Sequence, residues 1–214
     1  ITRIAVEQRY GTLTIFNRDT RYALTVQAQS RSYLYDGTEK RIQSLVSDSF
    51  EVNGVRYHIE GLDVLGQGTH AGTYPVTISG VPVVRDDYGN DVSEQFSVHT
   101  EAGILTIEPR NVELTSLDAG KEYDGTPLTN DKVEVSGDGF VQGEGAQYTV
   151  SGIQTIAGSS ANAFAYALNA NTKEDNYQIT QNYGTLRVTN RSSAYEITLV
   201  PQSGEALYDG EEHV

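Results

Sequence analysis

The chain has 214 residues, which is enough for one large domain or two small ones. It contains no Cys, so disulfide frameworks, thiolate metal sites and cysteine nucleophiles are excluded. Its 29 acidic and 15 basic residues give a net charge of −14, which argues against nucleic acid or an anionic membrane surface as a partner. The apolar runs are short and no Met is present, so we expect a processed or internal piece without a membrane span or signal peptide.

Two sequence landmarks recur along the chain at similar spacings. Gly-x-Leu-x-(Ile/Val) begins at Gly11, Gly103 and Gly184, at spacings of 92 and 81. Tyr-Asp-Gly occurs three times, at spacings of 88 and 85: Tyr35, Asp36, Gly37; Tyr123, Asp124, Gly125; Tyr208, Asp209, Gly210. Because the two landmarks interleave, the sequence predicts tandem repeats.

The predicted repeat boundaries follow these landmarks. Residues 1–20 are the C-terminal strands of a preceding repeat, 21–110 and 111–190 are full repeats, and 191–214 hold the N-terminal strand of a following one. Between the landmarks, Thr73–Ile78 aligns with Ala163–Leu168. The alternative is that the folded units have boundaries that differ from the sequence period.

In chain order, the first elements read as strands and a hairpin. Tyr22–Val26 alternates polar and apolar residues with a period of two, as a half-buried strand does. Phe50–Tyr57 carries Asn53-Gly54 between two short alternating runs. Asn-Gly tolerates positive φ at both central positions of a tight turn, so a hairpin is predicted there.

The following segments also predict strands. Ala71–Ile78 forms one, and Phe96–His99 with Ile104–Ile107 form a hairpin that closes the repeat through a turn at residues 101–103. The alternating segments Val112–Leu114 and Tyr195–Leu199 open the next two repeats. No window of the chain shows the sustained apolar period of a capped helix.

The predicted fold class is therefore all-β, built from tandem small β-sandwich repeats of the Ig-like kind, with a β-grasp-like arrangement as the alternative. So small a unit depends strongly on its aromatic core. The best core candidates are those at which both full repeats keep an aromatic residue: Phe50, Phe140, Tyr57 and Tyr148.

The Tyr-Asp-Gly-Thr segments, the Gly72–Thr77 strand, and Asp175–Ile179 followed by Gly184–Val188 resemble the YDG/MBG-type repeats of bacterial cell-surface, adhesin-like proteins. The closest matches are residues 123–129 and 175–179, and the resemblance covers nearly the whole chain. It implies an extracellular location on the bacterial surface, wall-anchored through other regions. It also implies the task of a stalk, and some relatives are associated with mucin binding.

The Tyr-Asp-Gly motif itself favours a structural role over a chemical one. Glycine supplies a turn conformation, aspartate accepts local backbone N–H bonds, and the tyrosine ring packs at a domain edge. A motif that recurs once per repeat is more easily explained by folding than by repeated active sites.

One acidic loop is a candidate for calcium, with oxygen ligands from Asp86, Asp87, Asn90 and Asp91. Its spacing does not fit a calcium-loop pattern, so a solvated hairpin tip is the favoured interpretation. His58, His70, His99 and His213 lack metal-ligand spacing, and neither a nucleophile elbow nor a phosphate loop is present. We expect no cofactor and no catalysis.

The sequence therefore predicts a non-catalytic spacer. The alternative is an adhesive module that binds host glycans or mucin-type glycoproteins through some of its 14 tyrosines. A third possibility is an accessory domain of an enzyme. We also expect self-association or docking on the adjacent repeat through the incomplete terminal segments, residues 1–16 and 195–214, as open strand edges pair readily.

Overall fold

The computed structural model describes residues 7–14, 16 and 19–212. It confirms the all-β class, since its helical elements are two 3₁₀ turns, η1 (Ser93–Gln95) and η2 (Glu174–Asn176). In the described residues, neither turn has the length or apolar character needed to cross a bilayer. The strands are β1 (Tyr22–Gln27), β2 (Arg31–Leu34), β3 (Lys40–Ile42), β4 (Ser49–Val52), β5 (Val55–Gly68), β6 (Gly72–Asp86), β7 (Phe96–Glu101), β8 (Gly103–Glu108), β9 (Arg110–Ser116), β10 (Ala119–Glu122), β11 (Val133–Gly137), β12 (Ala146–Val150), β13 (Gly158–Ala161), β14 (Phe164–Leu168), β15 (Tyr177–Asn182) and β16 (Thr185–Thr189).

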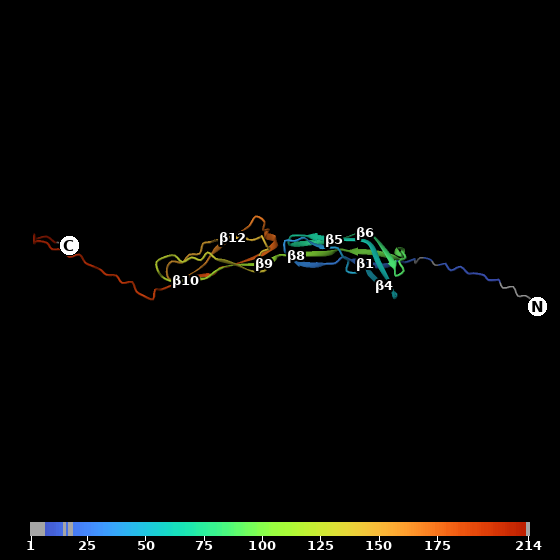
Figure 1. The fold of residues 1–214 in the computed structure, drawn as a ribbon, viewed down its shortest axis with the longest axis horizontal. Coiled ribbons are helices and arrows are strands. Elements are labelled where there is room, and N and C mark those ends of the chain that lie inside the picture. Colours follow the sequence, from blue (N-terminus) through green and yellow to red (C-terminus); the bar gives the residue numbers. More distant parts are fainter. Residues whose placement is uncertain (1–6, 15, 17–18, 213–214) are drawn as a thin grey trace, which may run out of the picture. The chain divides into compact units, whose positions relative to one another are not determined.

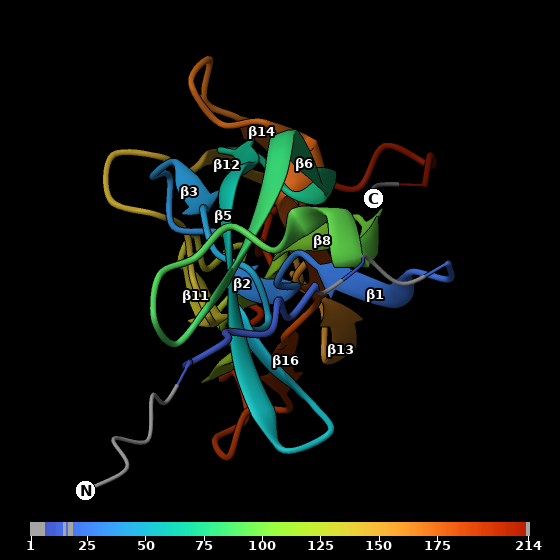
Figure 2. The same cartoon turned by 90° about the vertical axis from the view of Figure 1, so that its right-hand side faces the viewer.

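The strands form several small sheets (Figure 1, Figure 2). The largest has the order β2-β8-β6-β5-β3, with β4 also paired to β5, and β1 pairs with β7. The others have the orders β11-β9-β15, β10-β16-β13 and β12-β14.

The chain divides into two compact units. The first holds residues 1–114, 135–147 and 167–181, and the second holds 115–134, 148–166 and 182–214. Segments 135–147 and 167–181 belong to the second sequence repeat and yet pack in the first unit. The predicted repeat boundaries therefore describe the period of the sequence and not the bounds of the two compact units.

The first unit is organised by a long parallel ladder. β1 pairs with β7 from Tyr22–Phe96 onward, and β2 pairs with β8 from Arg31–Leu105 onward. The partners are 74 residues apart in both pairs, so the register is the same on either side of the short link between β1 and β2. The first strands of the repeat therefore run beside its last strands in the same direction.

The predicted closing hairpin is wrong, although both of its strands exist. β7 and β8 are separated only by Ala102, and each pairs with other strands: β7 with β1, and β8 with β2 and β6. The link is too short to reverse the chain. It lets the chain continue from one sheet into the next.

A close backbone approach explains the glycine at two of the three Gly-x-Leu landmarks, Gly103 and Gly184, whereas a Cβ atom on Gly11 would meet nothing within 4 Å. A Cβ atom on Gly103 would lie 2.8 Å from the carbonyl oxygen of Ala28 and closer still to that of Gln29. A Cβ atom on Gly184 would meet Leu117 O at 2.8 Å and Ser116 O more closely. Since these neighbours are backbone atoms, a side chain has no room at either position.

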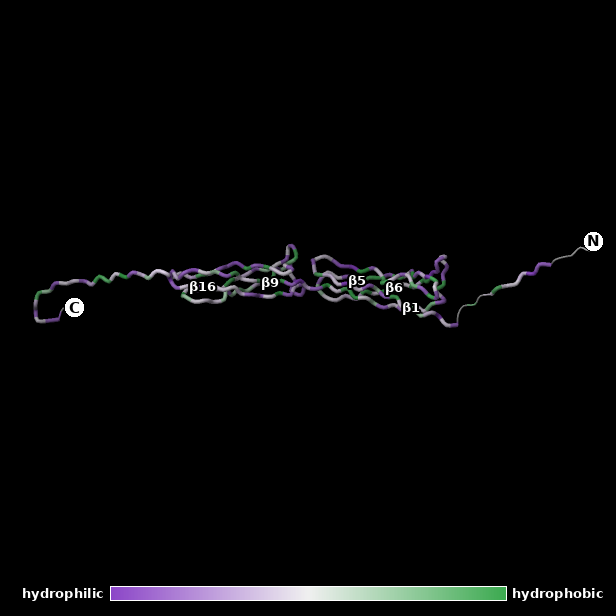
Figure 3. The backbone as a smooth tube through the Cα atoms, turned by 90° about the horizontal axis from the view of Figure 1, so that it is seen from below, coloured by the Kyte–Doolittle hydropathy of each residue, from purple (hydrophilic) through white to green (hydrophobic). Residues whose placement is uncertain are grey.

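The other hairpins follow the local signals. Val52 pairs with Val55 across Asn53 and Gly54, whose φ angles are 52° and 80°, as the tight turn requires. β5 and β6 then form a long antiparallel pair with a register shift between Glu60 and Leu62. Figure 3 shows the hydropathy along these strands.

The aromatic core differs from the expected one. The four predicted core residues are half-buried, whereas the buried aromatic residues are Tyr35, Phe96, Phe164 and Tyr177. Phe50 and Tyr57 lie on paired positions of a hairpin, and both rings contact Phe96, at 5.4 and 5.0 Å between centroids. The three rings form one cluster, in which Phe96 is buried and the other two rings are half-buried.

The described parts of the two terminal segments contain no strand. In residues 7–14, 16, 19 and 20, and again in 190–212, the structure contains no strand. Tyr195–Leu199 alternates as a strand does, but no neighbouring strand lies beside it to complete a ladder. Pairing of these segments with another molecule remains a prediction.

Candidate functional site: a tyrosine–carboxylate cluster

The most developed polar arrangement in the first unit joins two buried tyrosines through one carboxylate. The Tyr35 hydroxyl donates to Glu144 Oε1 at 2.6 Å, and the Tyr177 hydroxyl donates to Glu144 Oε2 at 2.7 Å. The two rings meet edge to face at 5.7 Å between centroids. Glu144 thus holds together two aromatic residues that are far apart in the sequence.

Arg110, at the start of β9, hydrogen-bonds to three backbone carbonyl groups next to this cluster. Its guanidinium donates to the carbonyl oxygens of Tyr35 at 3.2 Å, of Gly139 at 2.8 Å and of Asp138. The Asp138 carboxylate in turn accepts the backbone N–H of Asn111 at 2.9 Å. One arginine therefore ties the Tyr-Asp-Gly segment of the first repeat to a loop of the second.

A buried asparagine completes the cluster on its other side. Asn176 is 1 % exposed, and its Oδ1 accepts the backbone N–H of Ala71 at 2.9 Å. Its Nδ2 lies 3.3 Å from His70 Nδ1, and Lys173 Nζ lies 2.8 Å from His70 Nε2. These contacts hold the turn between β5 and β6 against η2.

The tyrosines of the cluster predict a loss of stability in alkaline solution. Burial, followed by the hydrogen bond to Glu144, raises the pKa of Tyr35 far above its usual value. Burial also raises the pKa of Tyr177 to about 12. Because the folded-state pKa values exceed the unfolded value of about 10, the stabilisation is complete below pH ~10 and is lost as pH rises toward 12.

Urea unfolding across this alkaline range should therefore show a falling free energy of unfolding. Tyr177→Phe should be less stable at neutral pH and should show a shallower alkaline decline. Tyr88→Phe, at an exposed ring, is the matched control and should keep the wild-type profile. If Tyr177→Phe kept the wild-type decline of the free energy of unfolding with pH, ionisation of Tyr177 could not be its cause.

The Tyr-Asp-Gly motifs form the turn that the sequence suggests. Their glycines, Gly37, Gly125 and Gly210, have φ angles of 79°, 82° and 86°. Asp36 Oδ1 accepts the N–H of Thr38 at 2.9 Å, and Asp124 Oδ1 accepts that of Thr126, also at 2.9 Å. In the third copy, Asp209 accepts the N–H of Glu211 at 3.0 Å.

Lysines from opposite sides of the motif neutralise the first two aspartates. Lys40 follows Asp36 and lies 2.5 Å from it, whereas Lys121 precedes Asp124 and lies 2.8 Å from it. The ammonium of Lys40 and the donors of Thr38 lower the pKa of Asp36 to about 2. Those of Lys121 and Thr126 hold the pKa of Asp124 well below its usual range. A lysine therefore does not have to recur at one sequence position to serve the same aspartate.

The candidate calcium loop is a closed turn at the end of the β6 strand. Asp86 accepts the backbone N–H groups of Tyr88 and Asn90 at 3.0 and 2.8 Å, and its second oxygen accepts Asn90 Nδ2 at 2.9 Å. Asp91 accepts the N–H and hydroxyl of Ser93 at 3.0 and 2.6 Å, while Asp87 Oδ1 lies 3.6 Å from His58 Nε2. The turn thus engages both carboxylate oxygens of Asp86 and one of Asp91 in local hydrogen bonds.

The three histidines among the described residues do not lie together. His58 and His99 are exposed, His70 belongs to the cluster above, and His213 lies outside the described residues. In residues 7–14, 16 and 19–212, no three His, Asp or Glu side chains are placed to hold a metal ion together.

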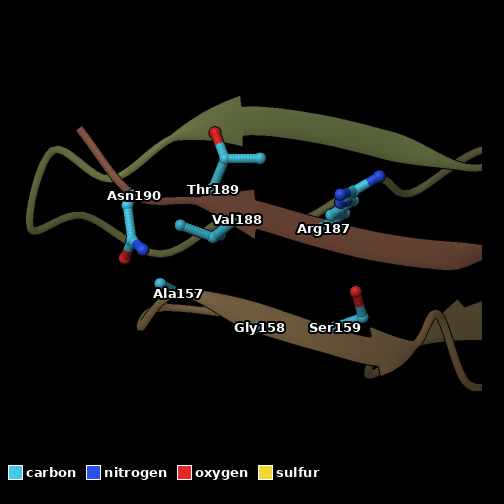
Figure 4. A pocket seen from close by; sticks show the side chains of 7 residues that line it. All are labelled: Ala157, Gly158, Ser159, Arg187, Val188, Thr189 and Asn190. Carbon is cyan, nitrogen blue, oxygen red and sulfur yellow. The ribbon is translucent and has the colours of Figure 1, made fainter. Parts of the chain in front are cut away.

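The second unit carries two neighbouring surface pockets, which share Ala157 and Asn190. The larger, of about 580 Å³, lies over the antiparallel pair β13–β16 where Ser159 faces Arg187 (Figure 4). The other, of about 370 Å³, is lined by the following residues: Tyr123, Ile156, Ala157, Asn190, Arg191, Ser193, Ala194 and Tyr195. It places the second Tyr-Asp-Gly tyrosine at an open apolar surface.

Sequence reasoning missed Glu144, Arg110 and Asn176. Glu144 lies in a Gly-rich loop without periodic pattern, and its role depends on two partners more than 30 residues away. The available signal was indirect: the Asn176-Tyr177 pair lies in a motif that carried the resemblance. Comparisons with protein-family models, with curated proteins and with solved structures find no match to this chain.

Proposed function

We propose that this chain is a non-catalytic spacer of an extracellular bacterial surface protein, built from tandem small β-sandwich repeats that carry tension. The parallel ladder of β1–β2 with β7–β8 is the observation that supports this proposal most directly. The resemblance to YDG/MBG-type repeats and the absence of Cys agree with it.

The direction of the paired strands determines whether a pulling force loads the hydrogen bonds of the ladder together or one at a time. The strand that enters the repeat begins at Tyr22, and the strand that leaves it ends at Glu108, which pairs with Leu34. Because the strands are parallel, these two points lie at opposite ends of the ladder. Tension along the chain therefore shears all of its hydrogen bonds together, which resists rupture better than opening them one at a time.

The second unit contains the same arrangement in part. β10 runs parallel to β16, with Ala119 opposite Leu186 and Glu122 opposite Thr189. The entering side of the repeat is again hydrogen-bonded to its leaving side. A parallel pairing of the entering and leaving strands in both units suits a stalk, because every repeat of a stalk carries the same tension.

The Glu144 cluster adds a second element of resistance. It ties Tyr35 of the first repeat to Tyr177 of the second through two hydrogen bonds to one carboxylate. Hydrogen bonds to charged groups are about twice as strong as neutral ones. Tension would have to break this cluster before segments 135–147 and 167–181 separate from the first unit.

Single-molecule pulling tests the proposal directly, and the 214-residue chain is suited to it because it contains no Cys. Handles at Asp19→Cys and Ser192→Cys load the ladder in shear. Handles at Asp19→Cys and Glu94→Cys pull on the starts of β1 and β7, which pair as Tyr22 with Phe96, and so open the ladder from one end.

At equal loading rates we expect a several-fold higher rupture force for the first unit with the shear handles. The second pair of handles is the matched control, because the same protein and the same hydrogen bonds are broken. Equal forces in the two geometries would exclude the ladder as a tension-bearing device.

Adhesive binding is the second candidate, favoured by tyrosines that are exposed outside the core. Tyr88 is 92 % exposed at the tip of the acidic loop and Tyr183 is 52 % exposed. On a glycan and mucin array the spacer proposal predicts no binding above that of an unrelated acidic β protein. Saturable binding that is lost in Tyr88→Ala or Tyr183→Ala would instead establish an adhesin.

A further inference from the structure

The two Tyr-Asp-Gly tyrosines of the full repeats occupy the same place in the fold. The Tyr35 N–H donates to the carbonyl oxygen of Glu108 at 2.9 Å, and the Tyr123 N–H donates to that of Thr189 at 2.9 Å. An arginine follows each acceptor by two residues, Arg110 in the first case and Arg191 in the second. Tyr35 with Arg110 therefore corresponds to Tyr123 with Arg191.

A third position corresponds as well. Gly72 pairs with Ile107, and Gly158 pairs with Val188, at the same place of the Gly-x-Leu landmark. This register corrects the sequence alignment of Thr73 with Ala163 and places Ile156 where the first repeat has His70. Ile156 lines the pocket that contains Tyr123 and Arg191.

The two equivalent sites differ in what covers them. Tyr35 is 2 % exposed, because Glu144 and Tyr177 lie against it, and Arg110 is engaged by the carbonyls of Asp138 and Gly139. Tyr123 is only half-buried, at an open pocket of about 370 Å³.

Arg191 lacks the neighbours that Arg110 has. It donates to the Ser193 carbonyl oxygen at 3.2 Å, and its guanidinium lies 3.9 Å from the centre of the exposed Tyr195 ring. Both contacts are made with the segment that follows it directly. These contacts of Arg191 are therefore made with nearby residues of the chain. At the equivalent surface of the first repeat, Glu144 and Tyr177 cover the tyrosine.

We propose that the pocket around Tyr123, Ile156 and Arg191 is a docking socket for a further repeat of the kind formed by residues 110–190. Its occupant presents a carboxylate to the Tyr123 hydroxyl, as Glu144 does to Tyr35, and an aromatic ring to the edge of the Tyr123 ring. Its loop carbonyls accept from Arg191, as those of residues 138 and 139 do from Arg110. The partner is thus recognised by charge, by aromatic packing and by backbone acceptors together.

The difference between His70 and Ile156 sets a preference within this class. His70 lies against the polar side chains of Lys173 and Asn176. Ile156 offers no hydrogen bond, so the socket favours a repeat with an apolar residue at the position of Asn176. This inference concerns recognition between repeats and stands whether or not the ladder carries tension.

A chain with one added repeat tests the socket. Residues 110–190 are duplicated directly after Asn190, so that the Arg110 of the copy takes the place that Arg191 has in the 214-residue chain. In the 214-residue chain, Tyr123→Phe should leave the unfolding equilibrium nearly unchanged. In the extended chain the same change in the first copy should raise the unfolding constant about tenfold, as loss of a hydrogen bond to a charged group does.

Two controls separate the socket from a general effect on folding. Tyr35→Phe should be costly in both chains, because its carboxylate partner is present in both. Ile156→His should stabilise only the extended chain, where it regains the partners that His70 has. An equal effect of Tyr123→Phe in the two chains would overturn the proposal.

Tyrosine nitration gives a readout that does not depend on stability. In the 214-residue chain, Tyr123 should be nitrated and Tyr35 protected. In the extended chain, with Tyr123→Phe in the added copy, the remaining Tyr123 should become protected, and Glu144→Gln in that copy should restore its reactivity. The docking proposal would be contradicted if Tyr123 stayed reactive in the extended chain, or if an oligosaccharide protected it in the 214-residue chain.

Discussion

Asn162→Asp is expected to destabilise the second unit by about 3–5 kcal/mol, the cost of a buried charge without compensation. Asn162 is fully buried, and its Nδ2 donates to the carbonyl oxygens of Leu117 and Asn130 at 3.0 and 2.9 Å. In aspartate, a carboxylate oxygen replaces the amide and faces these two acceptors. Attraction at this site thereby becomes repulsion without any change in shape.

The backbone of Asn162 makes the position harder to replace. Its carbonyl oxygen accepts the Ser116 hydroxyl at 2.6 Å, and its N–H donates to Gly184 at 2.7 Å. A shift of the substituted side chain away from the two carbonyls would pull on this backbone. It would therefore disturb the segment at Gly184, which carries the Gly-x-Leu landmark.

Urea unfolding with amide hydrogen exchange measures the effect and locates it in the second unit. Asn171→Asp is the matched control, because Asn171 is exposed and donates a single hydrogen bond to Gly143. Burial raises the pKa of the new carboxyl, so the lost stability should partly return in mildly acidic solution, where a protonated group can donate again. A loss below about 1 kcal/mol, typical of an exposed substitution, would contradict the importance of the Asn162 Nδ2 hydrogen bonds to Leu117 and Asn130.

Gly103→Ala is expected to cost about 3 kcal/mol, at the upper end for overpacking, because the added methyl group meets backbone rather than a flexible side chain. The carbonyls of Ala28 and Gln29 belong to the link between β1 and β2. Moving them would disturb the ladder on both sides, since β1 and β2 share one register against β7 and β8. Gly184→Ala should behave alike in the second unit, where Ser116 and Leu117 stand in the way.

Gly120→Ala is the matched control for these two substitutions. Gly120 lies in β10, and a Cβ atom there would meet only the Arg187 carbonyl oxygen at an ordinary 3.5 Å. Alanine should therefore be neutral, or stabilising by about 0.5–1 kcal/mol, since glycine weakens a strand interior. Thermal unfolding of the three variants checks the contrast, and similar losses at Gly103 and Gly120 would refute close approach as the cause.

The sequence by itself determined the class of the fold and the features that depend on neighbours along the chain. The alternation of Tyr22–Val26 predicted β1, and Asn53-Gly54 predicted the hairpin of β4 and β5. The Asp36 and Asp124 turns were also foreseeable, because each aspartate bonds to a residue two positions away. In such cases the residues that decide the conformation are adjacent in the chain.

Pairing between distant strands was decided by the tertiary structure alone. Phe96–Glu101 and Gly103–Glu108 have the pattern of two hairpin strands, yet their partners are β1, β2 and β6. Alternation tells which face of a strand is apolar but not which edge it shares. The Glu144 cluster is beyond the sequence for the same reason, since a carboxylate in a Gly-rich loop has meaning only when folding brings Tyr35 and Tyr177 to it.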